Sequence, residues 1–215
     1  MKVLVAGAHG KTARRLVRML TQDGHEVRGL VRKEGQMPDV ESDGAEPVLV
    51  DLEEEVAEAV GRAVGGCDAV VFAAGAGPGS GAARKETMDY GGAVKLVEAA
   101  EQNGVRRYLL LSSMGAGDPE GGSEPMRPYL RAKARADERL QSSGLDFTII
   151  RPGSLTDAEE TGSIEAAESL GRRGEISRSD VARTFAEALE LESTYGKTFE
   201  ILTGNTPIRD ALQRI

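Results

Sequence analysis

The chain has 215 residues, 40% of them hydrophobic, and its 27 Lys and Arg against 35 Asp and Glu give a formal net charge of −8. This length and balance predict one globular domain over residues 1–215, and the acidic excess disfavours nucleic acid and anionic membranes as partners. One Cys and two His exclude an intramolecular disulfide and a structural zinc cluster, and no apolar run approaches the ~18 residues of a membrane-spanning helix, so we expect a cytoplasmic protein without a metal.

Short apolar runs alternate with longer amphipathic stretches over the first 150 residues. Strands are predicted at 3–6, 27–31, 47–50, 69–73, 108–111 and 145–150. Helices are predicted at 11–22, 53–63, 85–102 and 128–141, with a weaker helix that Pro38 interrupts. This order predicts an α/β protein with a Rossmann-type, doubly wound parallel sheet and helices on both faces.

The alternation stops after residue 153. Residues 154–178 are polar, and Ile164 and Ile176 suggest a small hairpin. A helix at 179–191, capped by Ser177 or Ser179, a strand at 198–202 and a short helix at 207–212 complete the chain. The tail is too small for an independent domain, so we interpret residues of about 154–178 as a lid over the sheet that sets the substrate.

The first predicted strand runs into a glycine-rich turn at 7–13, followed at once by a helix. Gly7 and Gly10 suit a tight turn whose backbone approaches a pyrophosphate, and Ala13 lets the helix lie close to the strand. The helix N-terminus then offers free N–H groups to the phosphates. The alternative is an ordinary tight turn between a strand and a helix.

The end of the second strand indicates which dinucleotide is bound. An NAD site needs an acidic residue there for the ribose hydroxyl, whereas Arg32 and Lys33 suit a 2′-phosphate. We therefore predict NADP(H) over NAD(H), the alternative being that both are solvated loop charges. Asp51 follows the third strand and is placed to touch the adenine edge, and the small residues 73–75 after the fourth would let a ribose lie against backbone.

A candidate catalytic group follows the fifth strand. Tyr129 and Lys133 lie four residues apart, which places them on one helix face. An ammonium beside a phenol stabilises the phenolate, so Tyr129 could exchange a proton with a substrate carbonyl or alcohol. Ser113, or failing it Ser112, could polarise the same oxygen. The alternative is that Tyr129 packs and Lys133 is solvated.

These motifs resemble the short-chain dehydrogenase/reductase superfamily, and most closely its small atypical branch of single-domain NAD(P)-binding proteins with similarity to NAD-dependent epimerases and dehydratases. The resemblance implies that Tyr129 is the acid/base, that Lys133 also binds the nicotinamide ribose, and that Ser113 polarises the substrate. The implied cofactor-binding residues are Gly7, Ala8, His9, Gly10, Lys11, Thr12, Ala13, Arg32, Lys33, Asp51, Leu52, Ala73, Ala74, Gly75, Ser112, Lys133, Arg151, Pro152 and Gly153.

The length of the tail bears on the substrate. Sugar-nucleotide epimerases of the superfamily carry a substantial C-terminal region, but only about sixty residues follow Arg151. The first hypothesis is therefore an NADP(H)-dependent oxidoreductase of a small carbonyl or alcohol, acting as a monomer or homodimer. The alternatives are an NADPH-sensing regulator without turnover and an epimerase-like enzyme that recycles a tightly held cofactor.

Overall fold

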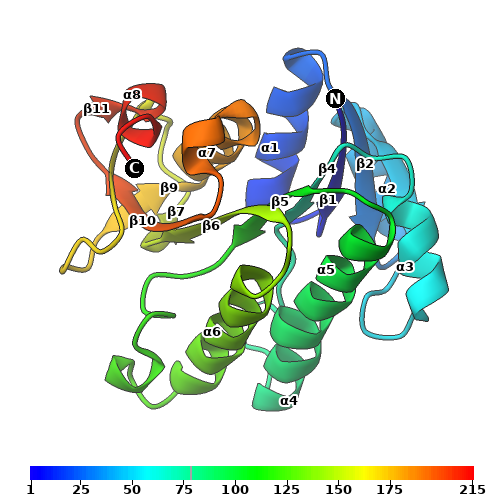
Figure 1. Ribbon diagram of the computed structural model, residues 1–215, viewed down its shortest axis with the longest axis horizontal. Coiled ribbons are helices and arrows are strands. Elements are labelled where there is room, and N and C mark those ends of the chain that lie inside the picture. Colours follow the sequence, from blue (N-terminus) through cyan, green and yellow to red (C-terminus); the bar gives the residue numbers. More distant parts are fainter. Residues whose placement is uncertain (78) are drawn as a thin grey trace.

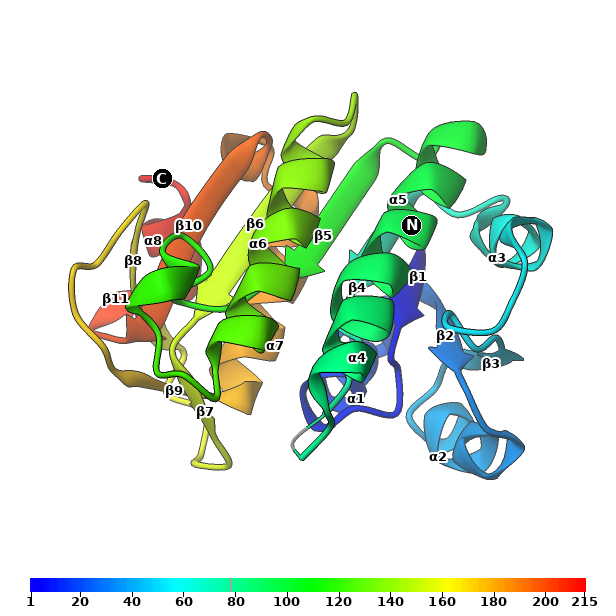
Figure 2. The same ribbon diagram turned by 90° about the horizontal axis from the view of Figure 1, so that it is seen from below.

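The computed structural model describes residues 1–77 and 79–215, which form a central sheet covered by helices (Figures 1 and 2). In these residues the main sheet has nine strands in the order β11-β8-β10-β6-β5-β4-β1-β2-β3. Their bounds are β1 (Lys2–Ala6), β2 (Glu26–Val31), β3 (Glu46–Leu49), β4 (Ala69–Phe72), β5 (Arg107–Leu111), β6 (Asp146–Pro152), β8 (Ser163–Ala167), β10 (Lys197–Thr203) and β11 (Thr206–Pro207). Neighbours from β3 to β10 pair in parallel, and β8 pairs antiparallel with β10 and β11.

The helices lie in two layers because the strands are apolar on both sides. In β1, Val3 and Val5 join one core cluster while Leu4 and Ala6 join the other, as alternation along a strand requires. Helices α1 (Lys11–Gln22) and α7 (Arg178–Glu190) lie side by side on one face, and α3 (Ala57–Val64), α5 (Ala93–Gln102) and α6 (Arg127–Gln141) cover the other (Figure 2). The predicted Rossmann-type fold is confirmed. In the described part of the chain, no helix is both long and apolar enough to cross a bilayer.

Two helices differ from the prediction. The helix expected from residue 53 begins at Ala57, because Asp51 organises a turn: its Oδ1 accepts from the Glu53 N–H at 3.0 Å and its carbonyl from the Glu55 N–H at 2.8 Å. The helix expected at 85–102 is a short α4 (Ala82–Arg84), a π-helix η2 (Lys85–Gly92) and then α5. The weaker helix before β3 is a 3₁₀ turn, η1 (Glu34–Gln36), and α2 (Met37–Ser42).

The predicted hairpin around Ile164 and Ile176 is wrong. Ile164 belongs to β8, which covers the exposed edge of β10 in the main sheet, while Ile176 belongs to β9 (Glu175–Ser177), which pairs in parallel with β7 (Ser154–Thr156). Both isoleucines are fully buried, but in the two different sheets. Ser177 caps α7 by accepting from the Asp180 N–H at 2.9 Å. The remaining elements are η3 (Pro119–Gly121), η4 (Glu192–Thr194) and α8 (Ile208–Leu212).

Arg107 fastens the C-terminal end of α7 to the sheet. Its guanidinium is buried, donates to the carbonyls of Ala188 and Leu189, and bonds Thr194 Oγ1 at 3.1 Å. The carbonyls at a helix C-terminus have no partner within the helix, and they carry the negative end of its dipole. Desolvation by burial lowers the pKa of Arg107 to about 10, so the group remains a cation at neutral pH.

We expect Arg107→Met to lower the free energy of unfolding by about 3 kcal/mol, because several buried carbonyls would lose their donor. Urea denaturation measures this change. Arg106→Met is the matched control, since Arg106 forms an exposed pair with Asp146 and its loss should leave the urea midpoint near that of the wild type. Equal midpoints for the two variants would contradict the role given to Arg107.

Candidate functional site

The turn after β1 brings two backbone segments into direct contact. Gly7 has φ +75°, and a Cβ added to it would lie 2.6 Å from Cα of Ala74, so only glycine fits there. The Gly10 N–H donates to the Gly7 carbonyl at 2.8 Å, which closes the turn. Gly10 is then the N-cap of α1, so the helix begins directly above the ends of β1 and β4.

The N-terminus of α1 suits an anion. Within the described residues, no side chain caps this helix end. The N–H groups of its first turn are therefore not bonded by a capping side chain, and the helix dipole adds a partial positive charge there. At residue 7, a residue with a Cβ would collide with Ala74. The close turn at Gly7 and the uncapped helix end together fit the pyrophosphate of a dinucleotide.

A cavity of about 210 Å³ adjoins this helix end. Its walls come from the carboxyl ends of β1 and β2 and from the segments after β3 and β4, where open parallel sheets bind ligands. Of the residues predicted to bind cofactor, the lining contains Gly7, His9, Gly10, Arg32, Asp51, Leu52, Ala73, Ala74 and Gly75. It also contains residues that sequence reasoning missed, among them Gln36, Arg84 and Met88.

Other predicted cofactor residues lie outside this lining, as the described residues define it. Ala8, Thr12 and Ala13 are buried beneath the turn. Lys11 extends away to pair with Asp157 of the segment after β7 at 3.1 Å. Lys33 is exposed one residue beyond Arg32, which does line the cavity.

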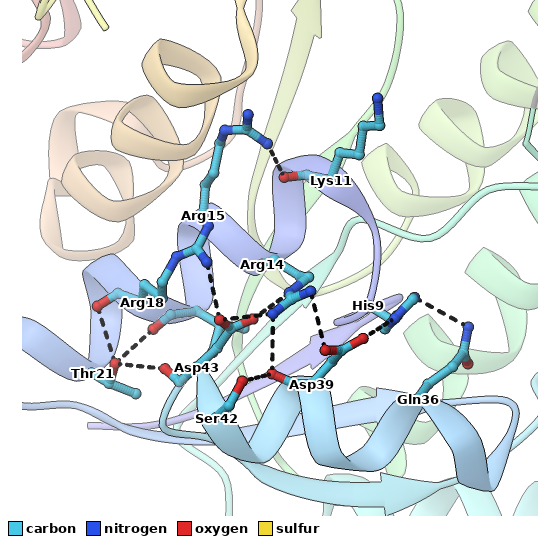
Figure 3. Close-up of polar contacts among 11 residues, drawn as sticks. His9, Lys11, Arg14, Arg15, Arg18, Thr21, Gln36, Asp39, Ser42 and Asp43 are labelled. Carbon is cyan, nitrogen blue, oxygen red and sulfur yellow. Dashed lines mark hydrogen bonds and ion pairs between the residues drawn. The ribbon is translucent and has the colours of Figure 1, made fainter. Parts of the chain in front are cut away.

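His9 ties the glycine turn to the segment after β2 (Figure 3). Its Nε2 lies 2.8 Å from Asp39 Oδ2, and its Nδ1 lies 3.4 Å from Gln36 Nε2. The hydrogen bond from His9, helped by the nearby Arg14, holds the pKa of Asp39 below its usual value. Arg14 in turn donates to Asp43 at 2.6 Å (Figure 3). These contacts fix α2 against α1 and place Gln36 at the cavity.

Tyr129 and Lys133 meet on one face of α6, as their spacing predicts. Lys133 Nζ lies 5.9 Å from the centroid of the Tyr129 ring and donates to the Leu111 carbonyl at 2.9 Å. Lys133 is only 3% exposed, which contradicts the alternative of a solvated lysine. Ser113 follows β5 at the same edge of the sheet, and its hydroxyl donates to the Met114 carbonyl at 3.2 Å. These residues lie outside the 210 Å³ cavity lining in the described chain.

Asp89 is a buried partner of Lys133 that the sequence reasoning missed. Its Oδ1 lies 3.6 Å from Lys133 Nζ, and its Oδ2 accepts from the Ala76 N–H at 3.3 Å. Asp89 is 2% exposed and comes from the π-helix η2, where α-helical periodicity gives no reliable indication of which residues face inward. The carboxylate therefore joins the loop after β4 to the candidate catalytic lysine.

Asp137 is a second buried carboxylate that was missed. Its Oδ2 accepts from the Ser112 hydroxyl and from Arg151 Nε, each at 2.9 Å. Burial raises the pKa of Asp137, while Arg151 and Ser112 act in the opposite direction. The hydroxyl of Ser112 is thus already bonded to a carboxylate. Asp137 follows Lys133 by four residues, and this spacing was the signal that could have revealed it.

The turn after β6 lies beneath the segment predicted as a lid. Arg151 and Pro152 end β6, with the Arg151 guanidinium directed to Asp137, and the Gly153 N–H donates to the Ile201 carbonyl at 3.1 Å. A Cβ on Gly153 would overlap the Gly174 carbonyl, so the turn and the lid segment touch through backbone. Among residues 1–77 and 79–215, no three or more His, Cys, Asp or Glu side chains gather as a metal site.

Comparison with known proteins agrees with this geometry. Residues 7–192 match the model of a family described as NAD(P)H-binding. The chain is 42% identical over 217 residues to "Uncharacterized sugar epimerase YhfK" of Bacillus subtilis (strain 168), with both proteins covered in full. It superposes on "Putative NAD-dependent epimerase/dehydratase from Bacillus halodurans" with a TM-score of 0.95 and 42% identity, covering 100% of both chains. For the oxidoreductase ylbE from Lactococcus lactis the TM-score is 0.88 and the identity 30%, over 100% of this chain and 96% of that one.

The fold and the glycine turn thus define a Rossmann-type nucleotide-binding protein. The chain belongs to the NAD(P)H-binding family, and the predicted resemblance to atypical short-chain dehydrogenases/reductases is confirmed. The family is oxidoreductase- and epimerase-like.

The contact at Gly7 leads to a prediction about cofactor binding. We expect Gly7→Ala to raise the Kd for NADPH at least ~10-fold, because the new methyl group must push the turn away from Ala74. Fluorescence titration measures the Kd. Gly24→Ala is the control: Gly24 also has a positive φ, at +86°, but a Cβ there meets nothing within 4 Å. Both variants should lose stability, of about 1–3 kcal/mol, whereas only Gly7→Ala should lose affinity. Unchanged binding by Gly7→Ala would show that the turn does not hold the dinucleotide.

Proposed function

We propose that the protein is an NADP(H)-dependent oxidoreductase that acts on a small carbonyl or alcohol. The observation that supports this most strongly is the Tyr129–Lys133 pair, with Lys133 buried against Asp89 and the Leu111 carbonyl. A bound nicotinamide would supply or accept the hydride. The residues of the chain bind and orient the two reactants and move the proton.

The dinucleotide would lie along the carboxyl ends of the strands. Gly7, Gly10 and the first amides of α1 would bind the pyrophosphate. Arg32, at the cavity, would bind the 2′-phosphate, and Gln36 would keep the Arg32 loop in place by accepting from its N–H at 3.2 Å. A 2′-phosphate fits this pair of a cation and an amide better than a ribose diol, which would need a carboxylate acceptor.

Proton transfer would fall to Tyr129. Its hydroxyl would donate to the carbonyl oxygen during reduction, and Lys133 would stabilise the phenolate left behind. The hydrogen bond to the Leu111 carbonyl and the ion pair with Asp89 fix the ammonium of Lys133 in the interior. Ser113 would donate a second hydrogen bond to the substrate oxygen by turning its hydroxyl away from the Met114 carbonyl, a neutral acceptor at 3.2 Å, whereas the Ser112 hydroxyl is bonded to the Asp137 carboxyl group.

The substrate would enter beside the segment predicted as a lid, residues 154–178, of which residues 163–167 are strand β8 of the main sheet, within a single domain. The relative YhfK is named a sugar epimerase, which favours a second candidate: an epimerase that recycles its cofactor in place. Cofactor that co-purifies with the protein, together with turnover without net NADPH consumption, would support the epimerase over the oxidoreductase.

We expect Arg32→Ala to raise the Kd for NADPH at least ~10-fold and to leave the Kd for NADH nearly unchanged, because only NADPH carries the 2′-phosphate. Calorimetric titration with both nucleotides tests this. Lys33→Ala serves as the matched control, since Lys33 lies outside the cavity lining among the described residues and should change the NADPH Kd much less. Equal NADPH affinity in wild type and Arg32→Ala would refute the preference for NADP(H).

We expect Tyr129→Phe to bind NADPH with wild-type affinity but to reduce carbonyl turnover at least ~10²-fold, because the proton donor is gone. NADPH oxidation with a panel of small aldehydes and ketones measures turnover. Tyr90→Phe is the control: Tyr90 lies on η2 with its ring against Arg135 and should keep full activity. Full activity in Tyr129→Phe would remove this residue from the mechanism.

A further inference from the structure

Two ammonium groups lie near the ring of Tyr129, and the sequence indicated only one of them. Lys85 Nζ is 5.7 Å from the centroid of the Tyr129 ring, and Lys133 Nζ is 5.9 Å from it. Lys85 comes from the first residue of η2, the helix that packs against α6. Lys85 is not part of the Tyr129/Lys133 motif, so its position beside the Tyr129 ring needs an explanation of its own.

The two helices contact each other in two layers. In the lower layer, Asp89 of η2 pairs with Lys133 of α6 at 3.6 Å, with both side chains less than 5% exposed. In the upper layer, four residues earlier on each helix, Lys85 faces Tyr129. The lower layer thus pairs a cation with an anion, whereas the upper layer places a cation beside a phenol.

Lys85 carries an unbalanced charge. It is half-buried, yet within the described part of the chain its ammonium has no carboxylate within 4.0 Å and donates no hydrogen bond. The nearby acids already have partners: Glu53 pairs with Arg84, and Glu86 pairs with Arg135. Partial desolvation of an unpaired ammonium is unfavourable, and an arriving anion would relieve it.

We propose that Lys85 binds an anionic group of the substrate, a carboxylate or a phosphate close to the carbonyl that Tyr129 protonates. This inference rests on the proposed function, because it places the substrate at the Tyr129 hydroxyl. An ammonium is a point charge with three donors, which suits an oxyanion of either kind, and a charge-assisted hydrogen bond to it is strong. Lys85 is a specificity-determining residue, and the substrate class is an anionic carbonyl compound or the corresponding hydroxy acid or phosphate.

The cofactor is a poorer partner for this lysine. The proposed pyrophosphate site is at the N-terminus of α1, and the proposed 2′-phosphate site is at Arg32. Arg84, one residue before Lys85, lines the 210 Å³ cavity, but Lys85 itself lies outside the lining that the described residues form. Lys85 instead faces α6, where the proposed proton donor lies.

The test measures anion binding without turnover, in the protein saturated with NADP⁺. Calorimetry is run with oxamate, which places a carboxylate beside a carbonyl, with its neutral analogue oxamide, and with methylphosphonate. The variants are Lys85→Met and Lys85→Arg, the latter restoring the cation. Arg135→Met is the matched control, because it also removes a cation from the contact between η2 and α6. Arg135 contacts Glu86 and Tyr90 there rather than Tyr129. NADP⁺ affinity and thermal stability are measured on the same samples.

We expect wild type and Arg135→Met to bind at least one of the two anions and neither to bind oxamide. Lys85→Met should raise the Kd for that anion at least tenfold, and Lys85→Arg should restore most of the lost affinity. The Kd for NADP⁺ should be unchanged in all variants. Tighter binding of oxamate would identify the anionic group of the substrate as a carboxylate, and tighter binding of methylphosphonate would identify it as a phosphate.

The proposal is overturned if wild type binds neither anion, or binds oxamide as well as oxamate, or if Lys85→Met binds anions as wild type does. Failure to bind NADP⁺ would contradict the proposed function instead. The same anion titrations on the nucleotide-free protein would then decide the role of Lys85 separately.

Discussion

The backbone contact between Gly7 and Ala74 is the constraint on which the site depends. It exists because neither turn carries a side chain larger than a methyl group at the point of approach, and because Gly7 can adopt φ +75° without strain. β1 has β2 on one side and β4 on the other, so the loops after β1 and β4 diverge at the place where the strand order reverses. The contact sets the depth of the cleft between them, and it places the N-terminus of α1 at the end of that cleft.

The part of the site proposed to be catalytic contains two buried ion pairs. Lys133, Asp89, Asp137 and Arg151 are all largely withdrawn from water, and each has a partner of opposite charge. Ions in such surroundings must be paired, and a pair that loses one member leaves an uncompensated charge. The pairs join α6 to η2 and to the end of β6, so the position of Lys133 is fixed from two directions.

The elements that sequence predicted best are those in which one property determines the structure. Continuous apolar runs predicted the strands. The glycine pattern predicted the first loop, whose Gly7 and Gly10 line the cavity. Prediction failed where a polar residue lies inside. Asp89 and Asp137 look like solvated helix charges until the packing of neighbouring helices is known, and Gln36 reaches the cavity only because His9 and Asp39 fix α2. The supposed hairpin failed because two apolar residues close in sequence are buried in different sheets, and pairing with β10 depends on contacts far along the chain.

The two ends of the site share one short segment of chain. In the loop after β4, Ala74 lies against Gly7 of the glycine turn, while the N–H of Ala76, two residues later, donates to the Asp89 carboxylate that pairs with Lys133. If the glycine turn were displaced, Ala74 would have to move with it, and the hydrogen bond from the Ala76 N–H would pass the movement to Asp89. Among the described residues, the ammonium of Lys133 has two polar partners, Asp89 and the Leu111 carbonyl, so a shift of Asp89 would move it relative to the Tyr129 ring. The turn proposed to bind phosphate and the proposed Tyr129–Lys133 pair are thus connected through backbone and a buried ion pair.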